Sequence, residues 1–404
     1  MNVVMLAPGY PTEIPRFVRG LTIMGARVLG VGDIPERELP ALAREHLAAY
    51  LQVPSLLDEG AVVEAVRGWS AAKQVERVEC LWEPGVLLAA RLREALGLPG
   101  LSVAAANRFR NKDLMKQAVA AAGIRTPRHA SARTAKECRA AVEKVGYPAI
   151  LKPIAGAGSQ DTYRVNNAAD LGEAIRRMGK IDEVNVEEFI DGEEYTFDTI
   201  CVDGEIKYFN IFWYRPRPLI ARSEEWISPQ TLALRDVEHA ALAGGRAMGK
   251  AVIDALGFQS GFTHMEWYLK PDGEAVFGEI AARPPGAHSV DVMNFACDMD
   301  VYAGWAEAVV RGTFSQQVER KYNANIIFKR ATGQGRIRNI EGLDRIARFR
   351  EHIVAMELLP IGAPRRNWIQ TLISDGFIIV RHPDLEACMD MSDAIGRELQ
   401  LHAG

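Results

Sequence analysis

The sequence lacks the cysteine pattern of a zinc finger or of a disulfide-stabilised domain. Five cysteines are scattered over 404 residues, and no two of them form a Cys-x-x-Cys pair. Cysteines of this kind argue against a structural zinc site and a disulfide framework, and they are typical of proteins in a reducing compartment. We therefore expect a cytoplasmic protein.

Long hydrophobic runs and an excess of positive charge are absent as well. No stretch approaches the roughly 20 apolar residues of a membrane-spanning helix. The first residues, MNVVMLAPGYP, lack the basic start of a signal peptide. The net charge is −4 and the isoelectric point is near 6.1, so attraction to nucleic acid or to an anionic membrane is not expected. We predict neither nucleic acid nor a membrane as a partner.

The composition is that of an ordinary globular protein, with 48% hydrophobic and 25% charged residues in a chain too long for a single core. Strand and helix patterns alternate over residues 1–110, which predicts a small parallel sheet with helices on its faces. Residues 111–315 are expected to form a second domain with two subdomains, about 111–185 and 186–315. Residues 316–404 are expected to form a small α+β cap. The predicted fold class is therefore α/β and α+β.

Local signals mark the elements of the middle region. Asn111 is a typical helix cap before KDLMKQAVAAAG. The strand YPAILKP ends near Lys152 and leads into the glycine-rich turn IAGAGSQD. Asp203-Gly204, between two strand patterns, predicts a two-residue hairpin turn. The Pro- and Arg-rich stretch at 215–226 predicts a loop that can act as a lid.

A second predicted hairpin places two carboxylates face to face. The stretch HMEWYLKPDGEAVFGEIAARP fits two strands joined by Asp272-Gly273, and a two-residue turn there pairs Glu266 with Glu279. Like charges at facing positions, whose Cβ atoms are about 4.5–5.5 Å apart, repel each other without a compensating cation. Mg²⁺ takes one or two carboxylates together with substrate phosphates. An exposed ladder without a metal, or a different register, is the alternative.

Residues upstream have the chemistry of a phosphate site. Lys152 supplies a charge, and the small residues after it, which include Gly158 and Ser159, let backbone N–H groups close on a phosphate. A plain β-hairpin is the alternative. Lys112 lies at a predicted helix start, where the helix dipole disfavours a cation, and an anionic ligand would explain it. An ordinary surface lysine is the alternative there.

The segment VNVEEFIDGEEYTFD adds three acidic residues, Glu187, Glu188 and Glu194, on a strand edge. Carboxylates do not aid phosphate binding, but they accept hydrogen bonds from an adenine amino group and from ribose hydroxyls. The pattern therefore indicates a nucleoside site, with a solvated acidic face as the alternative.

Two stretches resemble familiar nucleotide-binding motifs but lack residues or secondary structure that these motifs require. GGRAMGKA at 244–251 has the spacing of a P-loop, but Ala251 replaces the required Ser or Thr, and the segment lies inside a helical pattern at about 235–256. LGVGD at 29–33 lacks the third glycine of a dinucleotide fingerprint. The histidines do not pair with a cysteine or serine motif, so a hydrolytic triad has no support.

Taken in order, these features resemble the ATP-grasp superfamily. They are Lys112, then Lys152 with AGAGS, then EEFIDGEE, then Glu266 and Glu279 on one hairpin with Arg283. The resemblance covers about residues 1–315 and points to the carboxylate–amine ligase branch, which includes L-amino acid (dipeptide) ligases. It implies a small α/β domain, an ATP-grasp domain whose two subdomains clamp ATP, and a C-terminal part that completes the site.

The resemblance also implies a role for each residue. Lys112 and Lys152 would contact phosphates, and the loop with Gly158 and Ser159 would cover these phosphates. Glu187, with the backbone of Glu188 and Ile190, would hold the adenine, and Glu194 would hold the ribose. Glu266 and Glu279 would bind Mg²⁺ or Mn²⁺. Arg283 would neutralise the charge that develops as the γ-phosphoryl group moves. The resemblance therefore implies Arg283 and Lys152 as catalytic residues, and the hairpin register adds His264 as a third candidate.

His264 becomes a candidate site residue because this sequence departs from the usual pattern of the family. The family usually has Asn two residues after the second Glu, and this sequence has Ala281, so the number of metal ions stays open. The hairpin register that pairs Glu266 with Glu279 also pairs His264 with Ala281. We hypothesise that His264 fills this space and reaches the γ-phosphate when protonated, or orients a metal-bound water when neutral. Packing beside Trp267 or Tyr268 is the alternative.

The implied reaction is the activation of a carboxylate by ATP to an acyl phosphate, followed by attack of an amine to give an amide, ADP and phosphate. Positioning and charge neutralisation perform most of this work, so no nucleophilic side chain is needed. The expected partners are small carboxylates and amines, with amino acids among the candidates, and a homodimer is left open. A biotin-carboxylase-like enzyme and a non-catalytic ATP-binding sensor or scaffold are the alternatives.

Overall fold

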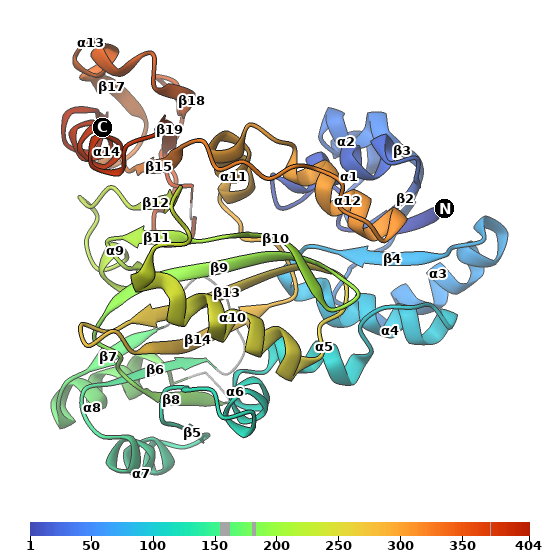
Figure 1. Ribbon diagram of the computed structural model, residues 1–404, viewed down its shortest axis with the longest axis horizontal. Helices are drawn as coiled ribbons and strands as arrows, with labels where there is room; N and C mark the ends of the chain where they lie inside the picture. The colour runs from blue at the N-terminus through green and yellow to red at the C-terminus, as the bar shows by residue number, and fades with distance from the viewer. Residues whose placement is uncertain (154–161, 180–182, 372) are drawn as a thin grey trace.

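The computed structural model describes residues 1–153, 162–179, 183–371 and 373–404, and Figure 1 shows how its elements are arranged. The N-terminal part is a parallel sheet in the order β3-β2-β1-β4, as predicted. Its core is formed by apolar side chains of the strands and of the helices between them. The elements are β1 (Asn2–Leu6), α1 (Ile14–Ile23), β2 (Arg27–Gly32), α2 (Ala41–His46), β3 (Leu47–Gln52), α3 (Glu59–Lys73), β4 (Arg77–Cys80) and α4 (Val86–Leu96), with 3-10 turns at Glu36–Glu38 and Glu83–Gly85.

A small antiparallel sheet in the order β5-β8-β6-β7 forms the next layer. The side-chain oxygen of Asn111 accepts hydrogen bonds from the N–H groups of Asp113 and Leu114, so the predicted helix cap is confirmed. Helices α7 and α8 bury their apolar faces against the sheet. The elements are α5 (Val103–Arg110), α6 (Lys112–Ala121), β5 (His129–Ala132), α7 (Ala135–Val145), β6 (Ala149–Pro153), β7 (Tyr163–Val165), α8 (Ala168–Arg177) and β8 (Val184–Glu188).

The largest unit is a nine-stranded sheet in the order β14-β13-β9-β11-β12-β15-β19-β18, with β10 beside β9. One of its faces packs against α1, α11 and α12, and the other packs against α6, α10 and α14. The elements are β9 (Glu193–Val202), β10 (Glu205–Asn210), β11 (Phe212–Arg215), α9 (Pro218–Ala221), β12 (Gln230–Ala233), α10 (Ala243–Leu256), β13 (Gly261–Leu269), β14 (Ala275–Ala281), α11 (Ser289–Cys297) and α12 (Val301–Arg311), with a 3-10 turn at Ala240–Leu242.

The predicted hairpin at Asp203-Gly204 is confirmed, since Val202 pairs with Glu205 across a two-residue turn. The strand after it is interrupted at Ile211, between β10 and β11. Next to this interruption, the N–H of Phe212 donates a hydrogen bond to the hydroxyl of Thr196 on β9.

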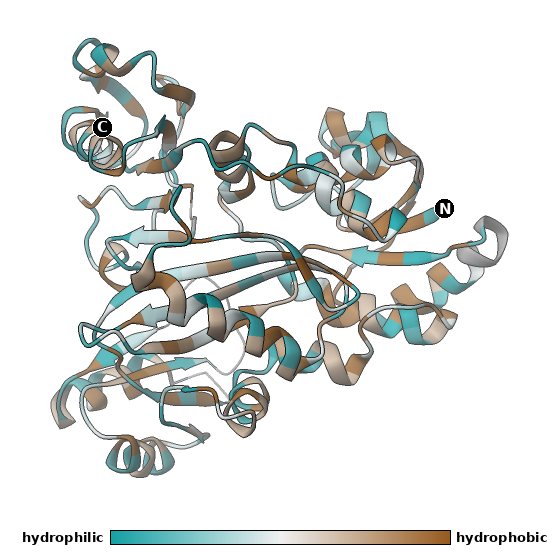
Figure 2. Ribbon diagram, in the orientation of Figure 1, coloured by the Kyte–Doolittle hydropathy of each residue, from teal (hydrophilic) through white to brown (hydrophobic). Residues whose placement is uncertain are grey.

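The P-loop-like stretch 244–251 lies inside α10, in which Figure 2 shows both hydrophobic and hydrophilic residues. Its glycines serve packing. A Cβ on Gly245 would lie 2.2 Å from the ring of Trp267, and one on Gly249 would lie 2.4 Å from the ring of Phe197. Only glycine therefore lets the helix approach the sheet this closely.

The region expected to form a C-terminal cap also extends the central sheet, because β15 pairs with β12 on one side and β19 on the other. The proposed domain boundaries stay a prediction. The remaining elements are β15 (Asn323–Lys329), β16 (Thr332–Gly333), β17 (Ile337–Glu341), α13 (Leu343–Ile346), β18 (Ile353–Leu358), β19 (Gly376–His382), α14 (Leu385–Glu398) and β20 (Gln400–Ala403), with a 3-10 turn at Ala347–Phe349.

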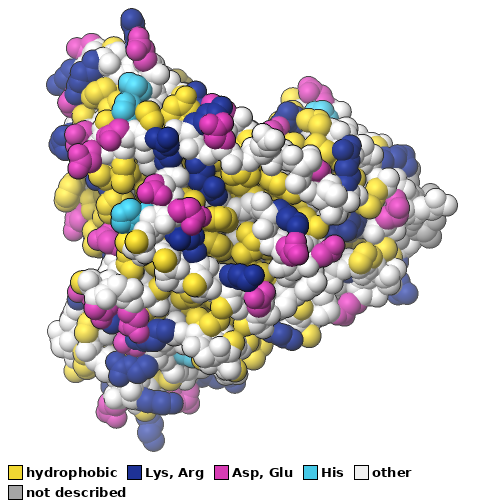
Figure 3. Space-filling view, viewed as in Figure 1, with side chains coloured by type: hydrophobic (Ala, Val, Ile, Leu, Met, Phe, Trp, Pro, Cys, Tyr) yellow, Lys and Arg dark blue, Asp and Glu magenta, His cyan; other side chains and the backbone are white. Residues whose placement is uncertain are grey.

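Two further features concern the whole molecule, namely the length of its apolar helices and the distribution of charge on its surface. Within the described part of the chain, no helix is long and apolar enough to cross a membrane. On the face drawn in Figure 3, acidic and basic side chains are interspersed rather than gathered into a patch of one sign.

Candidate active site

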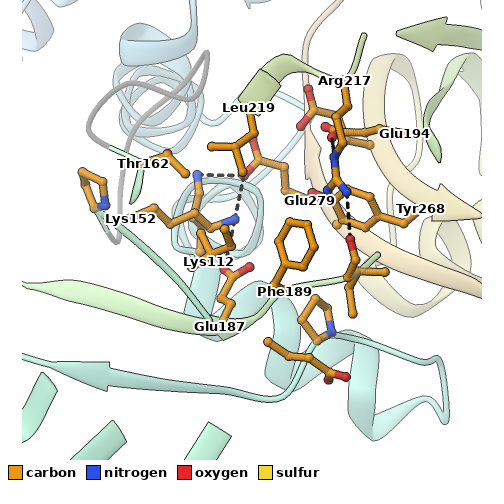
Figure 4. Close-up of a pocket in the computed structure, with 17 residues that line it drawn as sticks. Lys112, Lys152, Thr162, Glu187, Phe189, Glu194, Arg217, Leu219, Tyr268 and Glu279 are labelled. Atoms are coloured by element: carbon orange, nitrogen blue, oxygen red, sulfur yellow. Dashed lines mark hydrogen bonds and ion pairs between the residues drawn. The ribbon is translucent and has the colours of Figure 1, made fainter. Parts of the chain in front are cut away.

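A pocket lies where the small sheet faces the β13–β14 hairpin of the large sheet, and Figure 4 shows its lining. The pocket is open to solvent, and its empty volume, which includes part of that solvent, is about 760 Å³. Eight residues predicted as site residues line it: Lys112, Lys152, Glu187, Glu188, Ile190, Glu194, Glu266 and Glu279. The other lining residues are Pro127, Ile150, Pro153, Thr162, Phe189, Arg217, Leu219, Tyr268 and Gly278.

The two predicted phosphate lysines converge on one carboxylate. The Nζ atom of Lys112 lies 2.9 Å from Oε2 of Glu279, and that of Lys152 lies 3.8 Å from the same oxygen. Burial alone would raise the pKa of Glu279, but the two lysines outweigh burial and hold it well below its usual range. Burial would lower the pKa of Lys152, but Glu187 and Glu279 raise it instead. Lys152 is therefore held charged, and Lys112 lies against the same carboxylate of the β13–β14 hairpin.

Lys116, which the sequence did not single out, is the most deeply buried cation of this cluster. It lies one helical turn after Lys112, has no exposed surface, and forms an ion pair with Glu187. Burial lowers the pKa of Lys116 to about 8. Period-3.6 spacing from Lys112 was the available signal.

Glu187 is the counter-ion of two lysines. Its Oε1 atom pairs with Lys116, lies 3.0 Å from Nζ of Lys152, and accepts a hydrogen bond of 2.7 Å from Asn185. Burial acts to raise its pKa, but Lys116 and Lys152 lower it to about 2. The adenine contact assigned to Glu187 stays a prediction, whereas its role in orienting Lys152 follows from this geometry.

The facing carboxylates lie where the sequence predicted them, although the turn differs. Glu266 pairs with Glu279, and His264 pairs with Ala281. The turn is longer than two residues, because Leu269 pairs with Ala275, so the expected two-residue turn is wrong. A β-bulge between Glu266 and Trp267 restores the predicted register at the carboxylates.

Gly278 makes this bulge possible. A Cβ at this position would lie 2.7 Å from the carbonyl oxygen of Glu266, closer than such atoms approach. The bulge therefore requires glycine at this point.

The donor chemistry of the hairpin fits Mg²⁺ or Mn²⁺ as part of a shared site. Glu266 and Glu279 offer carboxylate oxygens on one face, and Glu279 already lies against two cations. Among the described residues, no three His, Cys, Asp or Glu side chains gather in a group that could hold a metal ion. Two carboxylates with phosphate oxygens from a nucleotide are a usual ligand set for Mg²⁺, so these residues fit a metal that arrives with its nucleotide.

His264 lies between two acidic groups. Its Nδ1 atom is 2.6 Å from Oδ1 of Asp198, which is fully buried, and its Nε2 atom is 3.6 Å from Oε1 of Glu266. Burial opposes protonation, but Asp198 and Glu266 raise the pKa of His264 to about 9. The imidazole is therefore charged at neutral pH. Asp198 was not identified from the sequence, and its functional importance and that of His264 stay predictions.

Arg283 joins the hairpin to the N-terminal parallel sheet, through a residue that follows β4. It forms an ion pair with Glu83, which also pairs with Arg110. Burial would raise the pKa of Glu83, but the two arginines outweigh it and hold that pKa below its usual range. Glu83 follows β4 next to β1, where the strand order of the parallel sheet reverses, the place at which open α/β sheets bind ligands.

The end of the pocket assigned to the nucleoside contains Glu188, Ile190 and Glu194. The carboxylate of Glu188 lies 3.1 Å from Arg125 and also pairs with Arg128, so the side chain has its own partners. Ile190 is buried. Burial and then Glu266 raise the pKa of Glu194 to about 8. Gly158 and Ser159, predicted to cover the phosphates, lie outside the described residues.

Comparison with known families and proteins decides the assignment of the fold. Residues 117–292 match the model of the ATP-grasp domain. The chain carries an ATP-grasp domain. The resemblance inferred from the lysines and the carboxylate hairpin is therefore confirmed, and with it the predicted fold class.

Individual relatives of this ATP-grasp chain include an "L-arginine-specific L-amino acid ligase" of Bacillus subtilis, 29% identical over 50% of this chain and 50% of that protein. A "formate-dependent phosphoribosylglycinamide formyltransferase" of Synechocystis is 29% identical over 67% of each chain. A solved L-amino acid ligase from Bacillus licheniformis has the same fold, with a TM-score of 0.81, 22% identity, and coverage of 100% of this chain and 98% of that one. The chain spans about half the length of the first curated relatives it matches.

Proposed function

We propose that the protein is an ATP-dependent carboxylate–amine ligase that forms a C–N bond and releases ADP and phosphate. The observation that carries this proposal is the convergence of Lys112 and Lys152 on the hairpin of Glu266 and Glu279. Paired cations opposite paired carboxylates suit a triphosphate with its metal. The relatives whose names contain the word ligase support the same reading.

The chemistry needs charge and position rather than a nucleophile. Lys112 and Lys152 would hold phosphate oxygens, with Lys152 oriented by Glu187. The metal, when bound, would neutralise phosphate charge during transfer. Arg283 would stabilise charge on the transferring group and on the acyl phosphate from the side of the N-terminal domain.

The substrate carboxylate would enter at the junction that contains Arg283 and Glu83. This junction lies where the strand order of the N-terminal sheet reverses, beside the β14 end of the metal hairpin. The loop after Arg283 holds Ala287 and His288 with positive φ, a costly conformation that is often found at functional sites. We propose that this loop contributes to substrate choice.

Amino acids fit this junction better than a phosphoribosyl substrate does. Glu13 is the residue before α1 and is 5% exposed, and its carboxylate accepts a hydrogen bond from the N–H of His288. A phosphate is disfavoured beside a buried carboxylate, although helix starts otherwise attract anions. This observation favours amino acids over substrates of the kind named for the formyltransferase relative.

Trapping the acyl phosphate tests the proposal. Hydroxylamine added with ATP, Mg²⁺ and pools of amino acids should yield a hydroxamate with one ADP per product. Formation of AMP and pyrophosphate would show adenylation and contradict the proposal. ADP release that requires bicarbonate instead of an amine would favour the carboxylase alternative, and ATP binding without turnover would favour a sensor or scaffold.

A further inference from the structure

Arg217 lies at the end of the pocket opposite the lysines, as Figure 4 shows. It precedes α9 in the segment 215–226, which was expected to act as a lid. One guanidinium nitrogen donates to the carbonyl oxygens of Ile190, at 2.9 Å, and Gly192, at 3.3 Å. The Nε atom lies 3.4 Å from Oε2 of Glu194. Arg217 therefore links three positions at the nucleoside end.

Aromatic rings fix the plane of this guanidinium. Its central carbon lies 5.0 Å from the ring centroid of Phe189 and 5.0 Å from that of Tyr268. Arg164 also stacks on Phe189, at 4.0 Å. Phe189 and Arg164 come from the side of the small sheet, and Tyr268 comes from β13 of the large sheet. Cations held over rings in this way gain stabilisation and lose orientational freedom.

Arg217 also forms part of a wall between two cavities. Phe189, Arg217 and Leu219 line the nucleotide pocket and also a second cavity outside it. A nucleoside in the pocket would therefore lie against one side of Arg217. The hydrogen bonds of Arg217 to the 190–192 backbone hold it in that wall.

Glu194 depends on this arginine for its charge partner. Its side chain is 6% exposed, and Arg217 is the cation paired with it among the described residues. A buried carboxylate with one cation is well placed to accept hydrogen bonds from a ribose diol. Arg217 acts to lower the pKa of Glu194 against burial and Glu266, which raise it, and in either form the carboxyl group has an oxygen that accepts a hydrogen bond.

We propose that Arg217 is a positioning residue for the nucleoside of ATP, which orients Glu194 toward the ribose hydroxyls and walls the pocket beside them. It acts on nucleotide affinity and ribose selectivity, at a distance from the phosphate chemistry of Lys112 and Lys152. The inference rests on the proposed function, because it requires that the ATP-grasp domain binds adenine nucleotides.

The test compares ADP with 2′-deoxy-ADP and 3′-deoxy-ADP by titration calorimetry of the full chain with Mg²⁺. In the unchanged protein, loss of one ribose hydroxyl should weaken binding about tenfold, the scale of a hydrogen bond to a charged group. Arg217→Ala should weaken ADP binding about tenfold and bring the ratio between ADP and the deoxy nucleotides within about twofold. Arg217→Lys should keep part of the ratio, because lysine can pair with Glu194 but has no second nitrogen with which to bind the carbonyls of Ile190 and Gly192 at the same time.

Two further variants separate positioning from general loss of structure. Glu194→Gln should abolish the same ratio, and the double variant with Arg217→Ala should be no worse than the single variants. Arg164→Ala is the matched control, since it removes a cation from the same ring stack without touching Glu194, and it should leave the ratio unchanged. If Arg217→Ala does not fold, the ratio between the affinities for ADP and for the deoxy nucleotides is measured with Arg217→Lys instead, and that result decides the test.

The outcomes distinguish this inference from the proposed function. An Arg217→Ala protein that keeps the full ribose ratio, or that binds ADP more tightly, would overturn the inference and leave the ligase proposal intact. An unchanged protein that binds ADP and the deoxy nucleotides equally well would also overturn the inference and leave the ligase proposal intact. Absence of any ADP binding by the unchanged protein would overturn both.

Discussion

At the residue scale, the site is a set of buried charges that hold one another in place. Glu279 faces two lysines, Glu187 faces Lys116 and Lys152, and His264 faces Asp198. Removing one partner from such a pair leaves a buried charge without compensation, which costs more than the pair contributes. Substitutions here are therefore expected to affect stability as well as activity, and the measurements must separate the two.

Glu279→Gln keeps the shape of the side chain and removes its charge. Turnover should fall by about 10² or more, the scale for losing one well-placed electrostatic group. From the hairpin alone, relief of the repulsion from Glu266 would leave stability level or raise it. Because Lys112 lies 2.9 Å away, we expect a loss of about 1–3 kcal/mol instead. Urea unfolding and an ADP-release assay measure the two effects, and near-normal turnover at low Mg²⁺ would refute the metal assignment.

His264→Ala should lower both melting temperature and turnover. It leaves Asp198 buried without its imidazolium, and it removes the group proposed to act at the phosphate. Turnover per folded molecule should fall while ATP-induced thermal stabilisation is mostly kept, and Ala281→Asn should restore part of the rate. If turnover per folded molecule is unchanged, His264 is structural.

Glu187 should make stability sensitive to acid. Its folded pKa of about 2 lies below the ordinary value near 4.5 because of Lys116 and Lys152. Its contribution is therefore complete above about pH 4.5 and is lost as the pH falls from there through 2. The difference in unfolding free energy between the unchanged protein and Glu187→Gln should shrink over that window in denaturant titrations. A constant difference would contradict the assigned ion pairs.

At the scale of elements, the β13–β14 hairpin depends on one glycine. Gly278→Ala would place a Cβ 2.7 Å from the carbonyl oxygen of Glu266, so the bulge must distort and the carboxylates must shift. We expect a loss of stability of about 1–3 kcal/mol and a fall in turnover, measured by unfolding and ADP release. Gly68→Ala, in α3 with open space around it, is the control and should be neutral or stabilising. Equal behaviour of the two variants would show that the bulge tolerates a side chain.

The β13–β14 hairpin also shows how much of the site could be predicted from the sequence. Alternation of side chains and the Asp-Gly turn predicted that Glu266 faces Glu279, and this is correct at the site. The turn is nevertheless longer than predicted, and the bulge at Gly278 compensates for it. A bulge is set by contacts between strands, which a local pattern does not contain. The register at the carboxylates was right although one step of its derivation was wrong.

The residues that form ion pairs with these side chains from distant parts of the sequence could not be predicted, for the same reason. Lys112 and Lys152 were recognisable from their places at a helix start and a strand end. Glu83 and Asp198 matter because folding brings them against Arg283 and His264, and no local signal distinguishes them from other charged residues. Lys116 had only its helical spacing from Lys112 as a signal, and its partner Glu187 is distant in the sequence. A charged residue in a helix or strand pattern is by itself more often solvated than buried.

At the scale of the whole molecule, one ion cluster connects the N-terminal domain to the ATP-grasp hairpin. Glu83 follows β4, Arg110 ends α5, and Arg283 follows β14, so three segments meet at a single carboxylate. The side chains are 14% to 17% exposed, which leaves the charges largely desolvated. The cluster therefore fixes the position of Arg283, which under the proposed function would lie beside the transferred phosphoryl group and the substrate carboxylate.

Glu83→Gln should separate nucleotide binding from carboxylate chemistry. With its carboxylate neutral, Arg283 loses its charged partner, so we expect a loss of about 3 kcal/mol in stability and a fall of about 10² in carboxylate-dependent ADP formation. ADP binding should stay within about threefold, because Lys112 and Lys152 do not contact Glu83. Glu79→Gln is the matched control, since Glu79 lies on β4, four residues before Glu83, but pairs with Arg77 and Arg93 within the N-terminal part of the chain. It should lower stability and leave the rate per folded molecule unchanged. Equal losses of rate in both variants would show that Glu83 acts only through stability, and the proposed junction would then have no part in the chemistry.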